Sequence, residues 1–224
     1  KIALFSRSKK DMENLRKRLK NPSHHISVKV DLLKNDKIKL AFNKAKKFLK
    51  EIDIVIHVAG GGLGLKDSLI NHKDLKMLFQ LNLGAAAEIN RLVTINKSKK
   101  NNLKLIHVGS IASYEAVASV GYNVAKSALA SYVKSLGRKL YKDKVIVTGI
   151  LPGGFIAPGN AMERFKNKNR KDYKKFIRTR LPRGIMGTVN EVLPMLLFLC
   201  SKHSMMMGGC LVPIDAGEGK SYKI

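Results

Sequence analysis

A serine, a tyrosine and a lysine stand out in the segment GSIASYEAVASVGYNVAK, residues 109–126, because most residues around them are small and apolar. A free tyrosine has a pKa of about 10, so it is a weak acid and a weak base at neutral pH. A fixed ammonium group such as that of Lys126 favours the phenolate of Tyr122 and is expected to lower its pKa. Such a tyrosine exchanges a proton with an alcohol or carbonyl oxygen, which the hydroxyl of Ser110 can hold in place. None of the three groups carries a hydride, so this chemistry needs a redox cofactor.

Short apolar stretches alternate with longer amphipathic ones along the chain. Four of the apolar stretches are nearly continuous, as expected for strands buried on both faces. The alternation predicts a mostly parallel sheet with helices on both faces, a doubly wound, Rossmann-type α/β fold. The expected strands are 2–5, 26–30, 52–58, 103–108, 145–150 and 211–214. The expected helices are 9–20, 35–50, 73–99, 121–142 and 189–200.

This fold brings the serine, the tyrosine and the lysine to one place. The strand 103–108 ends just before Ser110, at the carboxyl edge of the sheet, where ligands of such folds bind. In the helix 121–142, Tyr122 and Lys126 lie one turn apart, about 40° around the axis, so their side chains share a face. An isolated Tyr-x-x-x-Lys pair is more often structural, a half-buried ring beside a lysine that reaches water. The serine at the strand end favours the catalytic interpretation.

The composition is that of a folded chain with a core of its own. The 224 residues are 45% hydrophobic and have a mean hydropathy of −0.12, which is typical of globular proteins. No apolar run is long enough to span a bilayer, and two cysteines make no disulfide framework. Cys200, His203 and Cys210 lack the spacing of metal ligands, so we expect no metal site. These features predict a cytoplasmic protein.

Lysine and arginine outnumber aspartate and glutamate by 43 to 16, which gives a formal net charge of +27. The excess is mostly lysine and is spread over many segments, which indicates solvated helix faces rather than one basic arm. Two other interpretations stay open. In the first, the basic residues bind a polyanion such as nucleic acid; in the second, they steer an anionic substrate or cofactor to the site.

The segment from Ser110 to Lys126 resembles the active-site segment of the short-chain dehydrogenase/reductase family, and the resemblance extends over essentially the whole chain. Each further match is weak alone, but all follow in the family's order and spacing. They are a glycine turn after a strand, the segment of the active-site asparagine, the Pro-Gly turn beside the nicotinamide, the end of the substrate loop, and an ending near a subunit interface. In this chain they read HVAGG (57–61), LNLG (81–84), LPGG (151–154), LPRG (181–184) and PIDAG (213–217).

The resemblance implies an NAD(P)-dependent oxidoreductase that interconverts a carbonyl and a secondary alcohol. Tyr122 would be the acid/base, and Lys126 would lower its pKa and bind the nicotinamide ribose. Ser110 would orient the substrate oxygen. Asn82 would hold a water in a proton relay behind Lys126.

The residues at the end of strand 2–5 indicate NADP as the cofactor, with NAD as the alternative. An acidic residue at this place in the fold binds the adenosine ribose 2′-hydroxyl. This chain has Ser6 and Arg7 there, which suit a 2′-phosphate, unless Arg7 is one more basic surface residue. The cofactor contacts that the resemblance implies are Ser6, Arg7, Asp31, Leu32, Ala59, Gly60, Tyr122, Lys126, Pro152, Gly153 and Phe155.

The chain departs from the family near its first residues. The family opens with a strand and a glycine-rich turn that cradles the pyrophosphate, whereas strand 2–5 matches the family's second strand. We therefore expect 1–224 to be a single Rossmann-type domain that is N-terminally incomplete, with the first βα unit missing from the middle of its sheet. The glycine run 60–64 follows a later strand and is no substitute. Without that unit we expect weak or no dinucleotide binding.

The segment at about 155–183 matches the family's substrate lid and is rich in lysine and arginine. This charge favours an anionic substrate, unless it forms a solvated helix face. A 3-oxoacyl thioester and a nucleotide-sugar or other surface-glycan precursor stay open, the latter from a weak resemblance to dehydrogenases of bacterial surface-glycan synthesis. The resemblance also implies a homodimer or homotetramer. Two other functions stay open, a non-catalytic binding or regulatory relative (or an inactive fragment) and a basic polyanion-binding protein.

Overall fold

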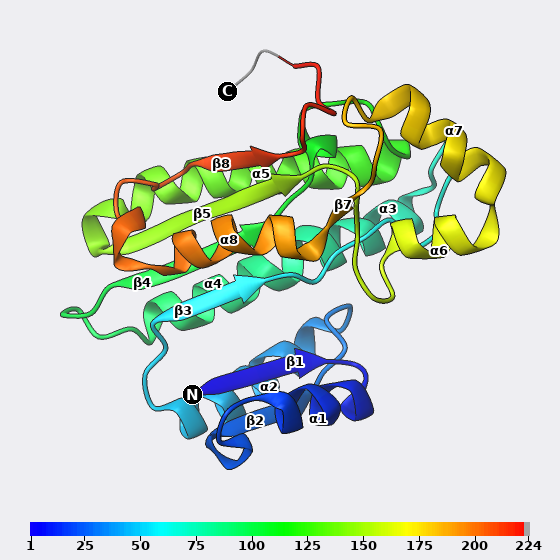
Figure 1. Cartoon of the computed structure of the whole chain (residues 1–224). Coiled ribbons are helices and arrows are strands. Elements are labelled where there is room, and N and C mark those ends of the chain that lie inside the picture. Colours follow the sequence, from blue (N-terminus) through cyan, green and yellow to red (C-terminus); the bar gives the residue numbers. More distant parts are fainter. Residues whose placement is uncertain (222–224) are drawn as a thin grey trace.

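The strands of the computed structural model, which describes residues 1–221, pair in parallel wherever they meet. Within these residues they are β1 (Ile2–Ser6), β2 (His25–Lys29), β3 (Ile54–His57), β4 (Leu103–Val108), β5 (Val145–Pro152), β6 (Phe155–Ile156), β7 (Gly187–Thr188) and β8 (Leu211–Ile214). The largest sheet has the order β3-β4-β5-β8, while β1 pairs with β2 and β6 pairs with β7 (Figure 1).

Helices cover both faces of the largest sheet. The α-helices of the described chain are α1 (Lys9–Arg18), α2 (Asn35–Leu49), α3 (His72–Phe79), α4 (Ala85–Ile95), α5 (Val120–Leu140), α6 (Ala161–Lys168), α7 (Arg170–Arg180) and α8 (Val189–Cys200). Short turns are η1 (Pro22–His24), η2 (Gln80–Gly84), η3 (Ile111–Ser113), η4 (Tyr141–Asp143) and η5 (Lys202–Ser204). Helices α4 and α5 pack on one face and α8 on the other, where Figure 1 shows it in front. The predicted doubly wound, Rossmann-type α/β fold is confirmed.

The pleat of β4 explains how one strand serves both helix layers. Leu103 and Leu105 are fully buried on the side of α4 and α5, in one cluster with Leu129. Ile106 faces the other side and packs against Leu199 of α8. Because successive side chains of a strand point to opposite faces, a strand between two helix layers is buried on both faces and is mostly apolar. The two polar residues of β4, Lys104 and His107, are buried as well, and the Lys104 Nζ donates to the Ser204 hydroxyl at 2.6 Å.

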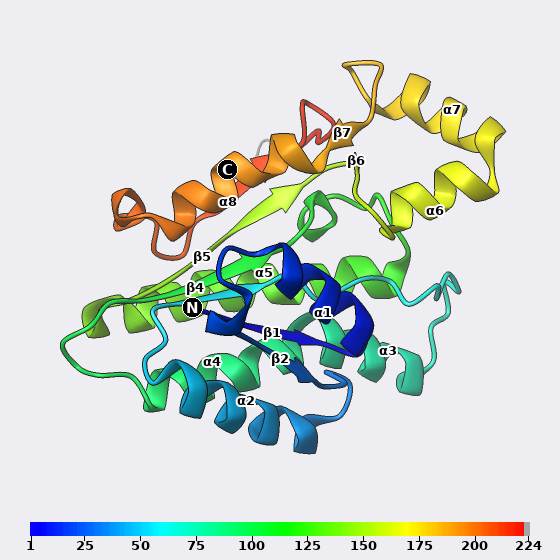
Figure 2. The ribbon, with the colours of Figure 1, turned by 60° about the horizontal axis from the view of Figure 1, so that its bottom comes forward.

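Strands β1 and β3 belong to separate sheets and are not hydrogen-bonded to each other, although they run in the same direction (Figures 1 and 2). On β3, Ile54 is 41% and Ile56 is 43% exposed, and Val58 just beyond it is 66% exposed. Ile56 lies in register with Ile106, so these apolar side chains are on the face that α8 covers elsewhere in the sheet. The expected βα unit between the two sheets stays a prediction.

Helix α2 joins the first two strands to the rest of the molecule. Ile38 and Phe42 of α2 are buried in the same cluster as Leu92 and Val93 of α4. Ala41 of α2 is buried in a second cluster with Val28 of β2 and Phe5 of β1. A single helix therefore spans both sheets.

The helix expected over 73–99 runs from His72 to Ile95, so it ends four residues early, and a π-helical turn divides it. Helix α3 ends at Phe79, a π-helical turn (η2) follows over Gln80–Gly84, and α4 begins at Ala85. A π-helical turn holds one residue more than an α-helical turn, and the apolar periodicity on both sides does not report it. The turn carries Asn82, whose side chain is buried.

Segment 155–188 forms a small cluster of its own, beyond the carboxyl ends of β5 and β8 (Figures 1 and 2). Tyr173, Leu181 and Met186 are its buried residues. Asn160 and Asn169 cap the helices α6 and α7, because each side chain accepts a backbone N–H of the following turn at 2.8 and 3.0 Å.

Candidate active site

The four expected catalytic residues come together at the carboxyl ends of β3 and β4. Ser110 starts the turn η3, and its Oγ accepts the N–H of Ala112 at 3.1 Å. Tyr122 and Lys126 lie in the first two turns of α5, and the Lys126 Nζ lies 5.7 Å from the centre of the Tyr122 ring. Asn82 reaches the same place from the turn η2, on the other side of the strand ends.

Lys126 is almost fully buried, with 3% of its surface exposed. Its Nζ donates to the carbonyl oxygen of Val108, at the end of β4, at 3.1 Å. Burial lowers the pKa of Lys126 to about 8, because a charged ammonium loses hydration there. At neutral pH the residue therefore still carries its charge.

The pKa of Tyr122 lies above its usual range, which contradicts the expected lowering by Lys126. Burial of the phenol disfavours the phenolate and has the largest effect, while a hydrogen bond with Ser110 acts in the opposite direction. The reason for the difference is geometric. The ammonium of Lys126 lies over the Tyr122 ring and bonds to the carbonyl of Val108, so it is not directed at the phenol oxygen. In this structure Tyr122 is a protonated phenol at neutral pH.

The amide of Asn82 fastens the glycine turn after β3. Its Oδ1 accepts the N–H of Gly61, and its Nδ2 donates to the carbonyl oxygens of Gly61 and Leu78, each at 3.0 Å. A Cβ at Gly60 would lie 2.8 Å from the Asn82 Oδ1 and 3.1 Å from the Lys126 Nζ. Only glycine fits between these two side chains at position 60.

The residues expected around the adenosine lie at the ends of β1 and β2. The Ser6 Oγ accepts the N–H of Ser8 at 3.3 Å, and Arg7 is exposed in the turn between β1 and α1. The Asp31 Oδ1 accepts the N–H of Leu33 at 3.1 Å. The carbonyl of Leu32 accepts a bond from Gln80 at 3.0 Å, which ties this loop to the turn η2.

The residues expected beside the nicotinamide follow β3 and β5. Ala59 and Gly60 are exposed just beyond the end of β3. Pro152 ends β5, the Gly153 N–H donates to the carbonyl of Ile214 at 3.0 Å, and Phe155 starts β6. β1 runs in the same direction as β3 (Figures 1 and 2), so both groups of expected contacts lie beyond carboxyl ends of strands that face the same way.

This donor set suits one end of a dinucleotide. A phenol, a hydroxyl and an ammonium gathered beside the exposed turn at Ala59 and Gly60 match the hydroxyls of a ribose and a substrate oxygen. The guanidinium of Arg7 matches a phosphate. Among residues 1–221 the turn after β1 has no glycine, so these residues supply no glycine-rich cradle at that helix N-terminus for the pyrophosphate.

A pair of histidines behind the site escaped the sequence reasoning. His57 of β3 and His107 of β4 stack with their ring centres 4.6 Å apart. Asn90 lies between them, with its Oδ1 2.7 Å from the His57 Nε2 and its Nδ2 3.2 Å from the His107 Nε2. Asn90 also donates to the Tyr132 hydroxyl at 3.2 Å. Burial lowers the pKa of His57 to about 4 and that of His107 well below its usual value, so both rings are neutral.

Only one ring nitrogen of His107, the Nε2, has a hydrogen-bond partner among the described residues. The Nδ1 of His107 is buried without a partner among the described residues. The register of β3 and β4 places the two histidines side by side. A sequence pattern without that register gives no signal for the pair.

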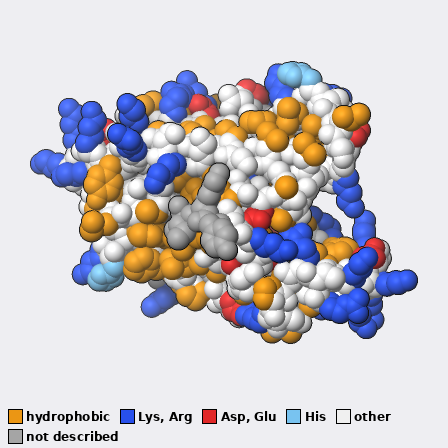
Figure 3. Space-filling view, turned by 90° about the horizontal axis from the view of Figure 1, so that it is seen from above, with side chains coloured by type: hydrophobic (Ala, Val, Ile, Leu, Met, Phe, Trp, Pro, Cys, Tyr) orange, Lys and Arg blue, Asp and Glu red, His pale blue; other side chains and the backbone are white. Residues whose placement is uncertain are grey.

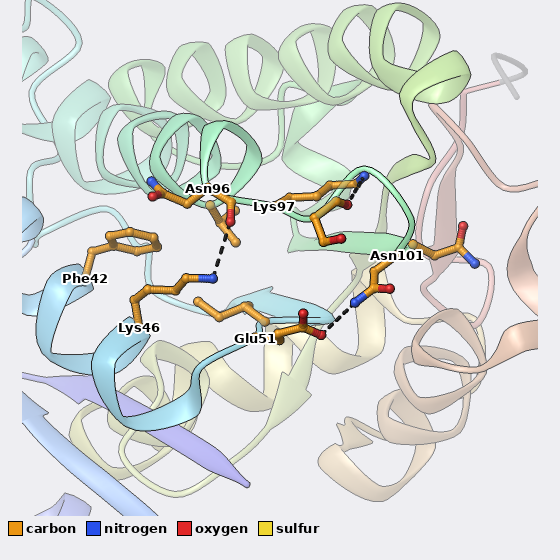
Figure 4. Close-up of a pocket in the computed structure, with 10 residues that line it drawn as sticks. Phe42, Lys46, Glu51, Asn96, Lys97 and Asn101 are labelled. Atoms are coloured by element: carbon orange, nitrogen blue, oxygen red, sulfur yellow. Dashed lines mark hydrogen bonds between the residues drawn. The ribbon is translucent and has the colours of Figure 1, made fainter.

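Two concavities lie at opposite edges of the sheet. One, at the carboxyl edge, encloses about 310 Å³ together with open solvent and is lined by residues that include Leu32, His57, Ala59, Asn82 and His107. The other, drawn in Figure 4, is at the amino ends of β3 and β4. Its polar side chains bond one another or nearby backbone: Lys46 donates to the Asn96 carbonyl at 3.3 Å, and Asn101 donates to Glu51 at 2.6 Å. Of the four catalytic candidates, Asn82 lines the first concavity.

The basic residues do not gather into one patch on the face that Figure 3 shows, where they are spread around its rim. Over residues 1–221 no helix is long and apolar enough to cross a membrane. In the same part of the chain no three His, Cys, Asp or Glu side chains come together as a metal site would require.

Known proteins match both the sequence and the fold. A family model described as enoyl-(acyl carrier protein) reductase matches residues 1–218. The 3-oxoacyl-[acyl-carrier-protein] reductase of Buchnera aphidicola subsp. Baizongia pistaciae is 27% identical over 216 residues, 95% of this chain and 84% of the relative. The protein of the same name from Aquifex aeolicus is 26% identical over 85% of this chain and 75% of its own length. The crystal structure of L-sorbose reductase from Gluconobacter frateurii with NADPH and L-sorbose covers 98% of this chain and 87% of its own, at a TM-score of 0.86 and 21% identity.

Proposed function

Because the chain belongs to the short-chain dehydrogenase/reductase family, we propose that it interconverts a carbonyl and a secondary alcohol with NADP, and that Tyr122 is its acid/base. The family match makes it an NAD(P)-dependent oxidoreductase that acts on CH–OH or C=O groups. The observation that carries the residue assignment is the cluster at the strand ends, where Tyr122 is hydrogen-bonded to Ser110 and lies beside buried Lys126.

The protonation states favour proton donation in the direction of reduction. Tyr122 is a protonated phenol at neutral pH, so it can give its proton to a carbonyl oxygen as that oxygen becomes an alkoxide. Ser110 orients the same oxygen, and the charge of Lys126 stabilises the phenolate that is left. Asn82, which holds the turn beside Lys126, is proposed to hold a water of a proton relay behind that lysine. When bound, the nicotinamide supplies the hydride, or accepts it in the reverse direction.

The proposal of NADP rather than NAD rests on the charges at the end of β1. Arg7 is exposed there beside Ser6, and none of residues 5–10 is acidic. L-sorbose reductase, which shares the fold, is described in complex with NADPH. The contacts proposed for the cofactor are Ser6, Arg7, Asp31, Leu32, Ala59, Gly60, Tyr122, Lys126, Pro152, Gly153 and Phe155.

We propose two substrate classes and rank one above the other. Two relatives are named 3-oxoacyl-[acyl-carrier-protein] reductases, which favours a 3-oxoacyl thioester. The basic lid that we assign to about 155–183 suits the anionic carrier of such a thioester. A nucleotide-sugar or other surface-glycan precursor is the second candidate, because it too is anionic. The proposal includes a cytoplasmic homodimer or homotetramer.

A further part of the proposal concerns the sheet. We propose that one more βα unit, with the glycine-rich turn of the family, lies between β1 and β3. The exposed apolar side chains of Ile54, Ile56 and Val58 support it, since such a helix would cover them. The separation of the β1-β2 sheet from the β3-β4-β5-β8 sheet supports it too.

NADPH oxidation tests the function. We expect a version that includes the upstream coding region to oxidise NADPH in the presence of a 3-oxoacyl thioester or a nucleotide-sugar ketone. Tyr122→Phe removes the donated proton and should lower kcat by about 10²-fold or more with the fold intact. Tyr114→Phe, at an exposed tyrosine outside the cluster, is the control. Full turnover by Tyr122→Phe would rule out the acid/base assignment.

A further inference from the structure

A buried carboxylate outside the catalytic cluster, that of Glu218, joins distant segments of the chain. Only 3% of its side chain is exposed. Its Oε2 accepts the backbone N–H of Gly154 at 2.6 Å, and its Oε1 accepts from the Nη2 of Arg180 at 3.0 Å. Gly154 lies in the turn after β5, and Arg180 is the last residue of α7. One carboxylate thus connects the proposed nicotinamide turn to the end of the proposed lid.

Arg180 extends this connection to a third segment. Its Nη1 lies 3.5 Å from the carbonyl oxygen of Val117, in the loop between Ser110 and Tyr122. Its guanidinium carbon lies 5.4 Å from the ring centre of Phe176, one turn earlier in α7. The guanidinium therefore lies between α7 and the loop that leads from the serine to the tyrosine.

The packing leaves the carboxylate little freedom. A Cβ at Gly153 would lie 2.8 Å from the Glu218 Oε2, and one at Gly154 would lie 3.3 Å from it. The turn that carries Glu218 is fixed in its own way, because the two carboxylate oxygens of Asp215 accept the N–H groups of Gly217 and Gly219, each at 3.1 Å. A charge held this closely by an amide and a guanidinium sets the positions of both.

We propose that Glu218 is a positioning residue for the reaction, whose ion pair with Arg180 latches α7 over the site and fixes the turn Gly153–Gly154. This inference rests on the proposed function for its effect on turnover. Glu218 touches none of the catalytic candidates, so its loss should weaken substrate and cofactor binding and leave the proton transfer at Tyr122 largely unchanged. A purely structural carboxylate would instead change stability without changing KM.

A tryptophan on the lid gives a readout that does not need turnover. The chain contains no tryptophan, and Phe165 of α6 packs edge-on against Tyr173 and Phe176. Phe165→Trp therefore creates a single indole that reports on the lid cluster. In this background we expect Glu218→Ala and Arg180→Ala each to shift the emission to longer wavelength and to raise acrylamide quenching about threefold. The double variant should add nothing to the larger single effect, because both changes break one pair.

The kinetic test separates binding from chemistry. Glu218→Ala and Arg180→Ala should each raise KM for substrate and NADPH by about tenfold and change kcat by less than about threefold. Glu218→Gln keeps an acceptor for the Gly154 N–H but loses the charge. Its KM should lie between that of the native protein and those of the two alanine variants. Arg91→Ala, which breaks the exposed pair with Glu88 on α4, is the matched control and should change neither readout.

Three results would overturn the proposal. In the first, a folded Glu218→Ala keeps the native lid fluorescence and KM. In the second, the effects of the two single variants multiply in the double variant, and in the third kcat falls while KM stays unchanged. If Glu218→Ala fails to fold, Arg180→Ala and Glu218→Gln decide in the same way. If the native protein turns over no substrate tested, the fluorescence still decides the latch. The assays with Tyr122→Phe decide the proposed function separately.

Discussion

At the scale of single residues, burial sets the charge of the groups at the strand ends. The phenol of Tyr122 keeps its proton because the phenolate would be poorly hydrated. The pKa of Lys126 falls to about 8 for the same reason, so its charge is retained at neutral pH but not far above it. At neutral pH Tyr122 is therefore a proton donor and Lys126 a cation, a combination that suits the reduction of a carbonyl.

The lowered pKa of His57, a half-buried residue, predicts a loss of stability in acid. Its pKa is about 4 when folded and about 6.5 when unfolded, so between these values the unfolded chain binds a proton that the folded chain does not. The contribution of His57 to the free energy of unfolding is fully present above about pH 6.5 and is lost as the pH falls toward 4. From His57 alone we expect a loss of about 2 kcal/mol between pH 7 and pH 5. The free energy of unfolding in urea at the two pH values measures it.

The variant His57→Asn should lose less stability over that interval, since the group that binds the extra proton is gone. His203→Asn, at an exposed histidine, is the matched control and should behave as the native protein does. An equal loss in His57→Asn and the native protein would contradict the assignment.

At the scale of elements, sequence signals predicted boundaries where local chemistry marks them. The strands 103–108 and 211–214 and the helix 189–200 begin and end as expected. Thr188 is the N-cap residue of α8, and its side chain and that of Glu191 form a reciprocal cap. The helix 73–99 was predicted as one element because its apolar spacing continues through the π-helical turn.

Local sequence patterns also explain which parts of the candidate site were predicted and which were not. Tyr122 and Lys126 are one helical turn apart and Ser110 follows a strand, so local patterns suffice to bring them together. The pair of Arg180 and Glu218 joins positions 38 residues apart, at the end of one helix and in a turn. No periodic pattern links such positions, so only the packed fold shows them to be neighbours.

The contact of α5 with β5 and the segment before β8 depends on a helix glycine. A Cβ at Gly137 would lie 2.6 Å from the Gly209 Cα and 2.9 Å from the Val147 carbonyl oxygen, and neither backbone can yield cheaply. Gly137→Ala should gain about 1 kcal/mol of helix propensity yet lose a net 2 to 3 kcal/mol, as estimated for overpacking. Thermal unfolding measures it, with Ser131→Ala on the exposed side of α5 as the control. A stabilised Gly137→Ala would show that the contact is loose.

At the scale of the whole molecule, the separation of the two sheets predicts a large effect of the proposed additional βα unit. A version extended by its upstream coding region should unfold at a temperature higher by about 5 °C or more, because the exposed face of β3 is then covered. It should also bind NADPH, whereas residues 1–224 alone should bind it weakly. Thermal scans and calorimetric titration with NADPH measure the two effects.

Replacing the glycines of the added turn by alanine gives the matched control for that experiment. This change should keep the gain in stability and lose NADPH, since it disturbs only the approach of the backbone to the pyrophosphate. Tight NADPH binding by residues 1–224 without the extension would refute the need for the additional unit.

The bridging position of α2 has a consequence for how the native protein opens. β1 and β2 pair in a sheet of their own on which α1 packs, and α2 packs against α4 through Ile38 and Phe42. If that helix contact loosens, these elements separate as one cooperative unit while β4 and β5 keep their ladder. Fluctuations of this kind would disrupt the proposed cofactor contact at Arg7 before the cluster around Tyr122, so we expect binding of the adenosine end of a dinucleotide to be lost first.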